Sequence, residues 1–375
     1  MTLIEPNGFR SSYLGVNYTG DLRRGQRLSS PRVTPDVAKL TSVEEGNLLA
    51  HSGPCDTYHI NDNNGNLFRF APSTKDKDEG GSWIEVPLHE ESRKPNSGIN
   101  LPNIDLSKER SDLALGMLKR TDVLLLSPLV VPPGLDLSPF DPGRKGAWYS
   151  LGFALRIVAR NLLDIDLNEL NVGYTVRNVD DQIKTEVFLS DSLENGSGYA
   201  SYLGKQENIK RTINAVKEYV DGLEHPIHSS NCDSSCYQCL SDFYNSSFHP
   251  IMDWRLARDL VDIIRGSGID LDLWRDTEAQ SAKIFSEAFG GEYREITSDV
   301  SAVRFSDFGK LLVVRHPFER SMRGLIDGDQ EGSTERMEAA FIESELESLG
   351  SFVDFSSFDL QRRPGWVFAE LLKTV

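Results

Sequence analysis

The chain has 375 residues, 39% of them hydrophobic, and a formal net charge of −17 at pH 7. That length exceeds what one hydrophobic core usually serves, so two or three domains are expected. The charge argues against a protein that binds nucleic acid alone, because such proteins normally present a basic surface to the phosphates. With no apolar run long enough to span a membrane and no secretory signal, a cytoplasmic protein is expected.

The N-terminal part of the chain is predicted to be irregular and then to form short strands. Residues 1–45 are rich in Gly, Arg, Ser and Pro, so we expect an extended segment that orders only against a partner. Strands are expected at residues 48–51, 58–60 and 67–70. The Asn- and Gly-rich residues 61–66 have the composition of a tight hairpin turn between the last two strands.

The middle of the chain alternates strands with amphipathic helices. Apolar residues that recur at helical spacing predict helices, and short apolar runs predict buried strands. The expected helices are 148–163, 209–223 and a third that Asp253 caps and Gly266 ends, and the expected strands are 121–126, 170–174 and 184–189.

The pattern repeats on a smaller scale after Gly266. A helix at 279–289, a strand at 310–315, an acidic helix at 334–349 and a strand at 352–355 are expected. We therefore predict an α/β (mixed α+β) fold with an embedded cysteine-cluster zinc site and a small α/β C-terminal appendix. The predicted domains are an extended segment (1–45), a zinc-binding domain (46–266) and the appendix (267–375), with the last boundary near 266–275.

Three cysteines fall within eight residues, at Cys232, Cys236 and Cys239, with histidines on both sides. Free cysteines are often small buried core residues, but those are usually scattered. A disulfide between two of these three cysteines would leave the third unpaired. The only other cysteine, Cys55, is remote in the sequence, so a disulfide is a poor interpretation of the cluster. Thiolate and imidazole groups at this density are typical ligands of a four-coordinate zinc site. We predict a structural zinc ion, Zn2+.

The sequence leaves the fourth ligand open. His249, ten positions after Cys239, is preferred over His228, four positions before Cys232, and Cys55 comes third. A water molecule in the fourth position would indicate catalytic zinc. Catalytic zinc also needs a general base, and the sequence near the cluster contains no clear candidate for one. A structural site is therefore favoured.

Other charged residues are weaker candidates for function. Of four short basic clusters, we favour the one with Arg10, Arg23 and Arg24 as a contact with nucleic acid or a partner protein, although such runs are more often solvated surface. The other clusters are Lys119 with Arg120, Arg144 with Lys145, and Arg362 with Arg363.

Three further features receive structural interpretations. The turn that contains Asp191, Gly196 and Gly198 has glycines that suit phosphate binding, but a tight helix start is favoured. His316 is interpreted as a satisfied structural histidine. Asp253 and the other helical carboxylates are interpreted as caps and exposed side chains.

The cysteine cluster and the residues after it resemble a known family. The segment reads Cys-x3-Cys-Tyr-x-Cys-Leu-x4-Asn-x3-His-x3-Asp-Trp-Arg-Leu-Ala from Cys232. It is similar to the zinc-binding domain of Mrf-type DNA-repair helicases and of the DrmB protein of DISARM anti-phage systems, and the resemblance spans about residues 8–265. Members of that family place four cysteines in the cluster, whereas this chain has three.

The resemblance implies a module that works with a helicase. The chain has no G-x-x-x-x-G-K-[ST] phosphate loop, so it is not expected to be an ATPase by itself. We expect a non-catalytic accessory module, or a piece of a longer chain, that partners a superfamily 2 helicase in DNA processing, in anti-phage defence or DNA repair. The alternative is a metal-dependent nuclease or hydrolase, for which no recognisable motif is present.

Overall fold

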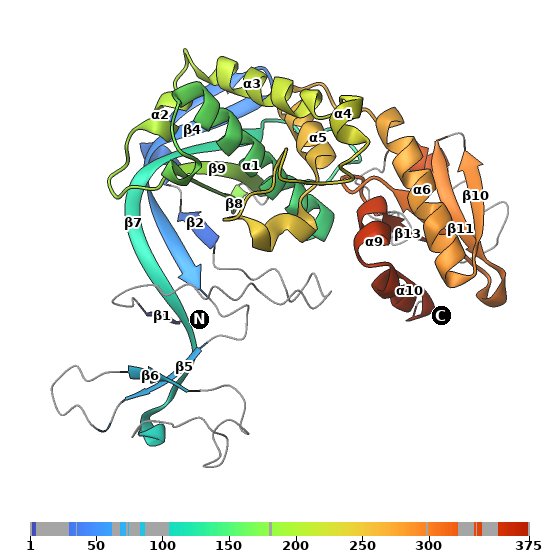
Figure 1. The fold of residues 1–375 in the computed structure, drawn as a ribbon, viewed down its shortest axis with the longest axis horizontal. Coiled ribbons are helices and arrows are strands. Elements are labelled where there is room, and N and C mark those ends of the chain that lie inside the picture. Colours follow the sequence, from blue (N-terminus) through green and yellow to red (C-terminus); the bar gives the residue numbers. More distant parts are fainter. Residues whose placement is uncertain are drawn as a thin grey trace. The chain divides into compact units, whose positions relative to one another are not determined.

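In a computed structural model, the chain forms two units, residues 1–34 with 56–120 and residues 35–55 with 121–375. The structure describes residues 2–4, 30–34, 36–61, 68–72, 74, 83–86, 105–179, 182–297, 299–321, 334, 336–339 and 352–373. Two long strands, β4 (Leu48–Asn61) and β7 (Arg110–Pro128), contribute to both units (Figure 1).

The first unit is built from strands that pair with residues 56–61 of β4 and residues 110–120 of β7. β2 pairs antiparallel with β4, β5 pairs antiparallel with β6 and β7, and β1 runs parallel to β7. Its further elements are β1 (Thr2–Ile4), β2 (Ser30–Thr34), β5 (Phe68–Pro72), β6 (Trp83–Glu85) and η4 (Leu106–Lys108). The two strands predicted at 48–51 and 58–60 are one continuous strand, and the predicted turn after Asn61 lies outside the described residues.

In the second unit, a three-layer arrangement supports the cysteine cluster. β7 pairs antiparallel with β9 (Gln182–Asp191), which pairs with β8 (Leu170–Val179), and β3 (Thr41–Glu45) pairs with β4. Helix α1 (Pro142–Leu163) lies across β8 and β9, and α3 (Ile209–Gly222) and α5 (Trp254–Arg265) pack on α1 (Figure 1). The strands and helices predicted here are confirmed, with α1 longer than expected.

Helix α1 begins at Pro142, six residues before the predicted start. The Asp141 side chain accepts hydrogen bonds from the backbone N–H groups of Gly143 and Arg144, and Pro142 occupies the first helical position. Both are favourable at a helix N-terminus. Helix α5 follows its prediction, with the Asp253 side chain as the N-cap and Gly266, at φ 84°, as the left-handed C-cap.

Helix α1 approaches the chain downstream of the cysteine cluster very closely at Gly146. A Cβ atom there would lie 2.0 Å from the carbonyl oxygen of Ile251, within η6 (Ser246–Ile251). One turn later, the Ser150 hydroxyl accepts a hydrogen bond from the backbone N–H of Asp253. These contacts fix the segment that leads from the cysteine cluster into α5.

Changing Gly146 to Ala should destabilise the protein, because the new methyl group meets backbone that cannot rotate away. Overpacking of this kind costs about 1–3 kcal/mol of unfolding free energy. Gly222→Ala in α3 is the matched control, since no atom lies within 4 Å of its Cβ position. That change should be neutral or stabilising by about 0.5–1 kcal/mol. Urea unfolding of both variants tests the difference, and equal stabilities would contradict the close approach.

The C-terminal residues form a four-stranded sheet in the order β10-β11-β12-β13, antiparallel except for the parallel pair β12–β13. Its elements are α6 (Asp272–Phe289), β10 (Glu292–Thr297), β11 (Val300–Phe305), η7 (Ser306–Phe308), β12 (Lys310–Arg315), β13 (Phe352–Ser356), α9 (Ser357–Arg362) and α10 (Pro364–Lys373). Alternate residues of the strands face opposite sides, so Leu312 and Val314 join the core under α6, whereas Leu311 and Val313 pack with Met337.

The mixed α/β class is confirmed by this arrangement of helices and open sheets. The strands predicted at 310–315 and 352–355 are present, and α6 begins at Asp272, seven residues before the predicted start. Strands β10 and β11 and helices α9 and α10 were not predicted. Of the acidic helix predicted at 334–349, residues 336–339 are helical and the others, apart from residue 334, lie outside the described part. The domain boundary near 266–275 stays a prediction.

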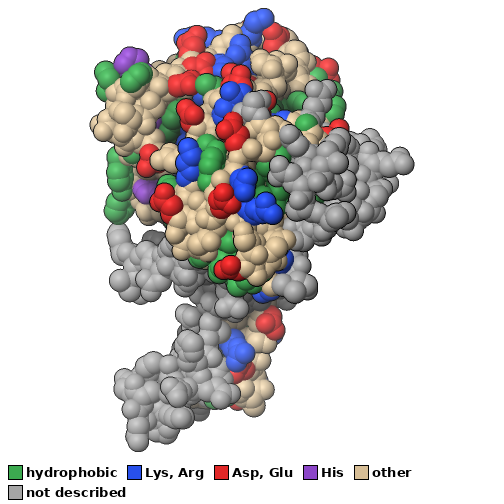
Figure 2. All heavy atoms as spheres, turned by 90° about the vertical axis from the view of Figure 1, so that its right-hand side faces the viewer, with side chains coloured by type: hydrophobic (Ala, Val, Ile, Leu, Met, Phe, Trp, Pro, Cys, Tyr) green, Lys and Arg blue, Asp and Glu red, His purple; other side chains and the backbone are tan. Residues whose placement is uncertain are grey.

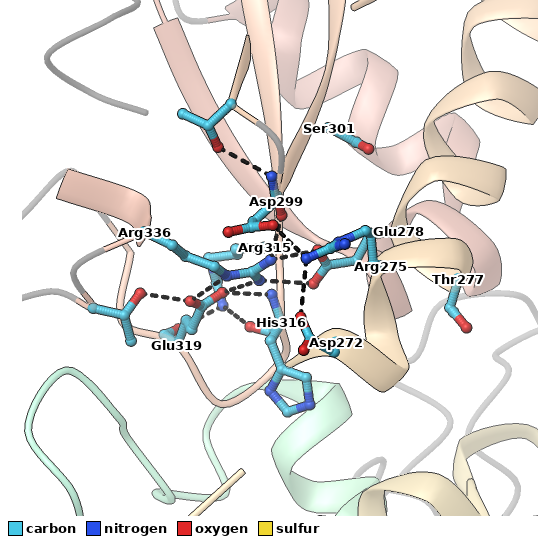
Figure 3. Close-up of polar contacts among 12 residues, drawn as sticks. Asp272, Arg275, Thr277, Glu278, Asp299, Ser301, Arg315, His316, Glu319 and Arg336 are labelled. Carbon is cyan, nitrogen blue, oxygen red and sulfur yellow. Dashed lines mark hydrogen bonds and ion pairs between the residues drawn. The ribbon is translucent and has the colours of Figure 1, made fainter. Parts of the chain in front are cut away.

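Buried polar groups hold the C-terminal elements together. The guanidinium group of Arg336 lies between the carboxylates of Glu278 on α6 and Glu319 after β12, with N–O distances of 2.8 and 2.7 Å (Figure 3). His316 is fully buried; its Nδ1 accepts a hydrogen bond from the backbone N–H of Phe318, so its Nε2–H donates to Asp259 on α5. The structural interpretation of His316 is confirmed.

Candidate metal centre

The short helix α4 (Pro226–Ser229) brings a histidine to the cysteine cluster. It begins just after α3, with the His225 side chain as its N-cap and Pro226 at its first position. Nδ1 of His228 lies 2.7 Å from the carbonyl oxygen of Leu223. Because a carbonyl group can only accept, Nδ1 carries the proton and, in the neutral ring, Nε2 keeps its lone pair for a metal ion.

Four ligand atoms converge at this point. The Sγ atoms of Cys232 and Cys239 are 3.9 Å apart, and Sγ of Cys236 lies 3.6 Å from Nε2 of His228. All four atoms lie within 4.8 Å of one another. In tetrahedral zinc coordination, Zn–S bonds of about 2.3 Å and Zn–N bonds of about 2.0 Å place neighbouring ligand atoms roughly 3.5–3.8 Å apart. The group therefore fits a zinc ion.

The spacing of the sulfur atoms excludes a disulfide in this state. All four cysteines of the chain are free thiols, and a disulfide needs sulfur atoms about 2.05 Å apart. The third candidate for the fourth ligand, Cys55, lies buried in β4 and is not in the converging group.

Contrary to the predicted preference, the structure brings His228 rather than His249 to the three thiols. His249 lies in η6, where its Nε2 is 2.8 Å from Oδ1 of Asn245 and 3.1 Å from the carbonyl oxygen of Asp242. These contacts orient its ring within its own turn. The alternative ligand His228 approaches because α4 projects it toward Cys236.

Backbone groups and an indole support the sulfur ligands. The backbone N–H of Cys236 donates to Sγ of Cys239 at 3.1 Å, and the N–H of Cys239 donates to the carbonyl of Cys236 at 3.0 Å. Trp254, buried at the start of α5, donates its indole N–H to the carbonyl oxygen of Cys232 at 3.3 Å. Such partners orient metal ligands and favour the thiolate form. The sequence alone gave Trp254 no role.

The environment affects the three thiols differently. Burial raises the pKa of Cys232 to about 11 and also raises the pKa of Cys239. Burial acts in the same direction on Cys236, but a hydrogen bond from the backbone of Gln238 and the interactions with the other three side chains of the cluster outweigh it and lower the pKa of that thiol. A bound zinc ion would favour the thiolate at all three positions, and the residues available to it are these three and His228.

A family comparison bears on this centre. Residues 151–240 match the family model described as MZB, the MrfA Zn-binding domain. This segment of the chain is therefore similar to the MZB family. The matched segment runs from α1 to Leu240 and so contains His228 and the three cysteines, but not His249. The four converging residues thus lie within the matched segment, and the expected resemblance to Mrf-type proteins is confirmed.

Similar proteins extend the comparison beyond the MZB segment. The Druantia protein DruE of Escherichia coli (strain UMEA 4076-1) is 30% identical over 166 residues, which are 41% of this chain and 8% of DruE. A crystal structure of the DUF1998 helicase MrfA bound to DNA matches with 13% identity and a TM-score of 0.36 over 63% of this chain and 24% of MrfA. MrfA with DNA and AMPPNP matches with 11% identity and a TM-score of 0.25, over 60% and 21% of the two chains. The chain thus spans a small part of these proteins.

The remaining candidate residues of the sequence lie elsewhere. Arg10, Arg23 and Arg24 fall outside the described residues, so their contact with nucleic acid or a partner stays a prediction. Arg144 and Arg363 are buried and pair with Asp136 and Asp359, so those two basic clusters are not solvated patches. Within the described chain, no helix is both long and apolar enough to cross a membrane.

The turn after β9 starts a helix, as the sequence predicted. Asp191 is fully buried, and its carboxylate accepts hydrogen bonds from the backbone N–H groups of Ser197, Tyr199 and Ala200. It thereby caps α2 (Tyr199–Leu203). Gly196 lies at φ 73° directly beside Asp122, where a Cβ atom would be 2.0 Å from a carboxylate oxygen. The amides that might cradle a phosphate are therefore occupied by the protein's own carboxylate.

Proposed function

We propose that this chain is a non-catalytic accessory module, stabilised by zinc, that acts with a superfamily 2 helicase motor on DNA. The observation that carries the proposal is the convergence of His228 and three cysteines inside the MZB segment. Four protein ligands leave no open position for water, which is the arrangement of structural zinc. The family takes its name from MrfA, which is described as a helicase bound to DNA.

We propose the biological process from the resemblance to DrmB proteins and the cellular compartment from the redox state of the cysteine cluster. Three thiols that must stay reduced to hold zinc suit a reducing compartment, so we place the protein in the cytoplasm. We assign the module to anti-phage defence, with DNA repair as the other process in which similar domains act. A test of the setting is whether deleting the module's gene lowers resistance to phage while growth after DNA damage stays normal.

The surroundings of the carboxylates support a non-catalytic role. Asp191 caps α2, Asp253 caps α5 and binds Arg255 at 2.8 Å, and Asp259 accepts hydrogen bonds from Trp274 and His316. These carboxylates are engaged in holding helices. We therefore expect that the purified chain hydrolyses neither ATP nor nucleic acid.

The experiment compares a superfamily 2 helicase motor from the same genome with and without the chain. We expect the chain to bind the motor and to increase its DNA-stimulated ATP hydrolysis or its unwinding of a tailed duplex. Magnesium- or manganese-dependent cleavage by the chain alone would favour the nuclease alternative, if it is lost in Asp191→Ala or Asp253→Ala. Because both residues cap helices, that loss counts only when the unfolding temperature of the variant is normal.

Binding to DNA should depend on the motor. With a net charge of −17, the chain alone displaces few counterions from phosphates, so its affinity should be weak and should fall steeply with salt. Fluorescence anisotropy with a single-stranded oligonucleotide at physiological salt tests the chain, the motor and the mixture. Replacing Arg10, Arg23 and Arg24 by Ala should weaken DNA binding by the mixture if that segment contacts DNA. Tight binding by the chain alone would contradict the accessory role.

A further inference from the structure

Residues 237–244, which we call the aromatic loop, expose three large rings directly after the metal-binding cysteines. Tyr237, Phe243 and Tyr244 are 74%, 71% and 70% exposed. Isolated exposed apolar residues are common, but clusters of them mark interaction sites. Tyrosine and phenylalanine are also enriched at the centres of protein interfaces. Three such rings within eight residues therefore need a functional explanation.

Contacts through His249 connect the two ends of the aromatic loop. The ring of Tyr237 packs edge-on against His249 at 5.6 Å, and Nε2 of His249 lies 3.1 Å from the carbonyl oxygen of Asp242. The next two residues, Phe243 and Tyr244, pack edge-to-face at 5.5 Å. His249, which lies outside the group of converging ligands, thus joins the two ends of the loop. Figure 2 shows hydrophobic side chains beside histidines at the left edge of the face drawn.

The backbone beneath these rings is held in place. Oδ1 of Asp242 accepts hydrogen bonds from the N–H groups of Tyr244 and Asn245, at 2.6 and 3.0 Å. Asn245 is 1% exposed and donates its amide to the carbonyl oxygen of Leu240 at 2.8 Å. The other carboxylate oxygen of Asp242 binds Arg156 on α1. A surface that is ordered before binding loses little conformational entropy when a partner binds.

The charge of the segment that contains the aromatic loop argues against a phosphate backbone as its partner. The 37 residues from Glu218 to Trp254 contain no Lys or Arg. They contain six acidic residues: Glu218, Asp221, Glu224, Asp233, Asp242 and Asp253. Asp242, Asp253 and Glu224 pair with arginines and Asp221 pairs with Lys217, while Glu218 and Asp233 are exposed and have no ion pair among the described residues. Platforms that stack single-stranded bases combine aromatic rings with a positively charged groove. This segment has the rings and the opposite charge.

We propose that the aromatic loop is a docking surface for a second protein, the helicase motor, through an apolar patch edged by Lys or Arg. The proposal rests on the proposed function and adds where the motor binds and by which chemistry. The three rings expose on the order of 400 Å², about half of the roughly 800 Å² that each partner buries in a standard interface. The loop thus supplies the apolar centre of the contact, and the exposed carboxylates supply its acidic edge.

The test measures binding of the full chain to a superfamily 2 helicase motor from the same genome, by titration at physiological salt. Phe243→Ser combined with Tyr244→Ser should weaken binding by about tenfold or more, as expected for residues at the centre of an interface. Phe140→Ser is the matched control, because Phe140 is equally exposed, at 73%, but lies in the loop before α1. Asp233→Lys should also weaken binding, by a smaller factor. Zinc content and unfolding temperature should stay unchanged in all of these variants.

A second readout locates the contact directly. A photo-crosslinking amino acid in place of Phe243 should crosslink to the motor, whereas the same group in place of Phe140 should not. If the wild-type chain binds the motor and the loop variants bind equally well, the docking surface is wrong while the proposed function stands. If the wild-type chain does not bind the motor, both are wrong. Loss of oligonucleotide affinity or of self-association in the loop variants, with motor binding retained, would assign the surface to DNA or to a second copy.

Discussion

Replacing Cys232 by Ser is expected to abolish tight zinc binding and to unfold the segment between α3 and α5. The free energy of zinc binding to structural sites is about 10–16 kcal/mol at neutral pH, which is as large as the whole stability of a typical domain. Helices α1, α3 and α5 pack on one another and should persist, so the loss should be local. Elemental analysis of protein purified without added metal, and hydrogen exchange of residues 223–253, measure the two effects.

Two pairs of variants make this test specific to the four converging residues. Cys55→Ser is the control for Cys232→Ser, because Cys55 is also a buried free thiol but is not in the converging group. His249→Ala is the control for His228→Ala, because only His228 belongs to that group. We expect His228→Ala to lose zinc and His249→Ala to retain it. The reverse result, or normal stability of wild-type protein without bound zinc, would refute the assignment of the centre.

The cysteine cluster of the candidate metal centre could be predicted from the sequence, but the fourth residue that joins it could not. The spacing of three cysteines is a local property, so counting residues was enough to find them. Choosing between His228 and His249 depends on the direction of each side chain. That direction is set by the carbonyl group of Leu223 for His228, and by Asn245 and Asp242 for His249. His228 lies four positions before Cys232, and this short spacing was the only sequence signal that favoured His228 as the fourth residue.

The fold was predictable where local signals agreed with tertiary packing. Helix α5 combines an N-cap at Asp253, an apolar face and a terminal Gly266, and its predicted bounds are those of the structure. Strand β4 was divided in the prediction because it contains Gly53 and Pro54, which usually interrupt strands. Gly53 lies at φ 145°, a conformation that glycine adopts readily, so the strand continues through it.

Edge elements of the C-terminal sheet were missed for a different reason. Strand β10 pairs with one neighbour, β11, and is mostly exposed, so its sequence carries Glu292, Arg294 and Glu295 instead of an apolar alternation. The buried ion pairs that hold this sheet could not be predicted from the sequence either. Arg336 is separated from Glu278 by 58 residues, and a charged residue in a polar segment is normally interpreted as solvated surface.

Replacing Arg336 by Met is expected to destabilise the C-terminal sheet strongly. All five N–H donors of its guanidinium group are used, by the carboxylates of Glu278 and Glu319 and by the carbonyl oxygen of Asp299 (Figure 3). The side chains of Glu278 and Glu319 are 1% and 0% exposed. Methionine fills a similar volume but leaves two buried carboxylates without their cation. Breaking a buried ion pair in this way costs about 3–5 kcal/mol.

The matched control is Arg275→Met, because Arg275 also pairs with two carboxylates, Asp272 and Asp299, but is 47% exposed. Exposed pairs contribute about 0–1 kcal/mol, so urea unfolding should separate the two variants clearly at neutral pH.

Burial disfavours the charged form of Glu319, yet the charge and hydrogen bonds of Arg336 outweigh it and lower the pKa of Glu319 in the wild-type protein. Without Arg336, burial should raise the pKa values of Glu319 and Glu278 above those of the unfolded chain. The folded variant then binds more protons than the unfolded chain, so its stability relative to wild type should recover as the pH falls below neutral. A deficit as small as that of Arg275→Met, or one that grows on acidification, would show that these buried carboxylates do not depend on Arg336.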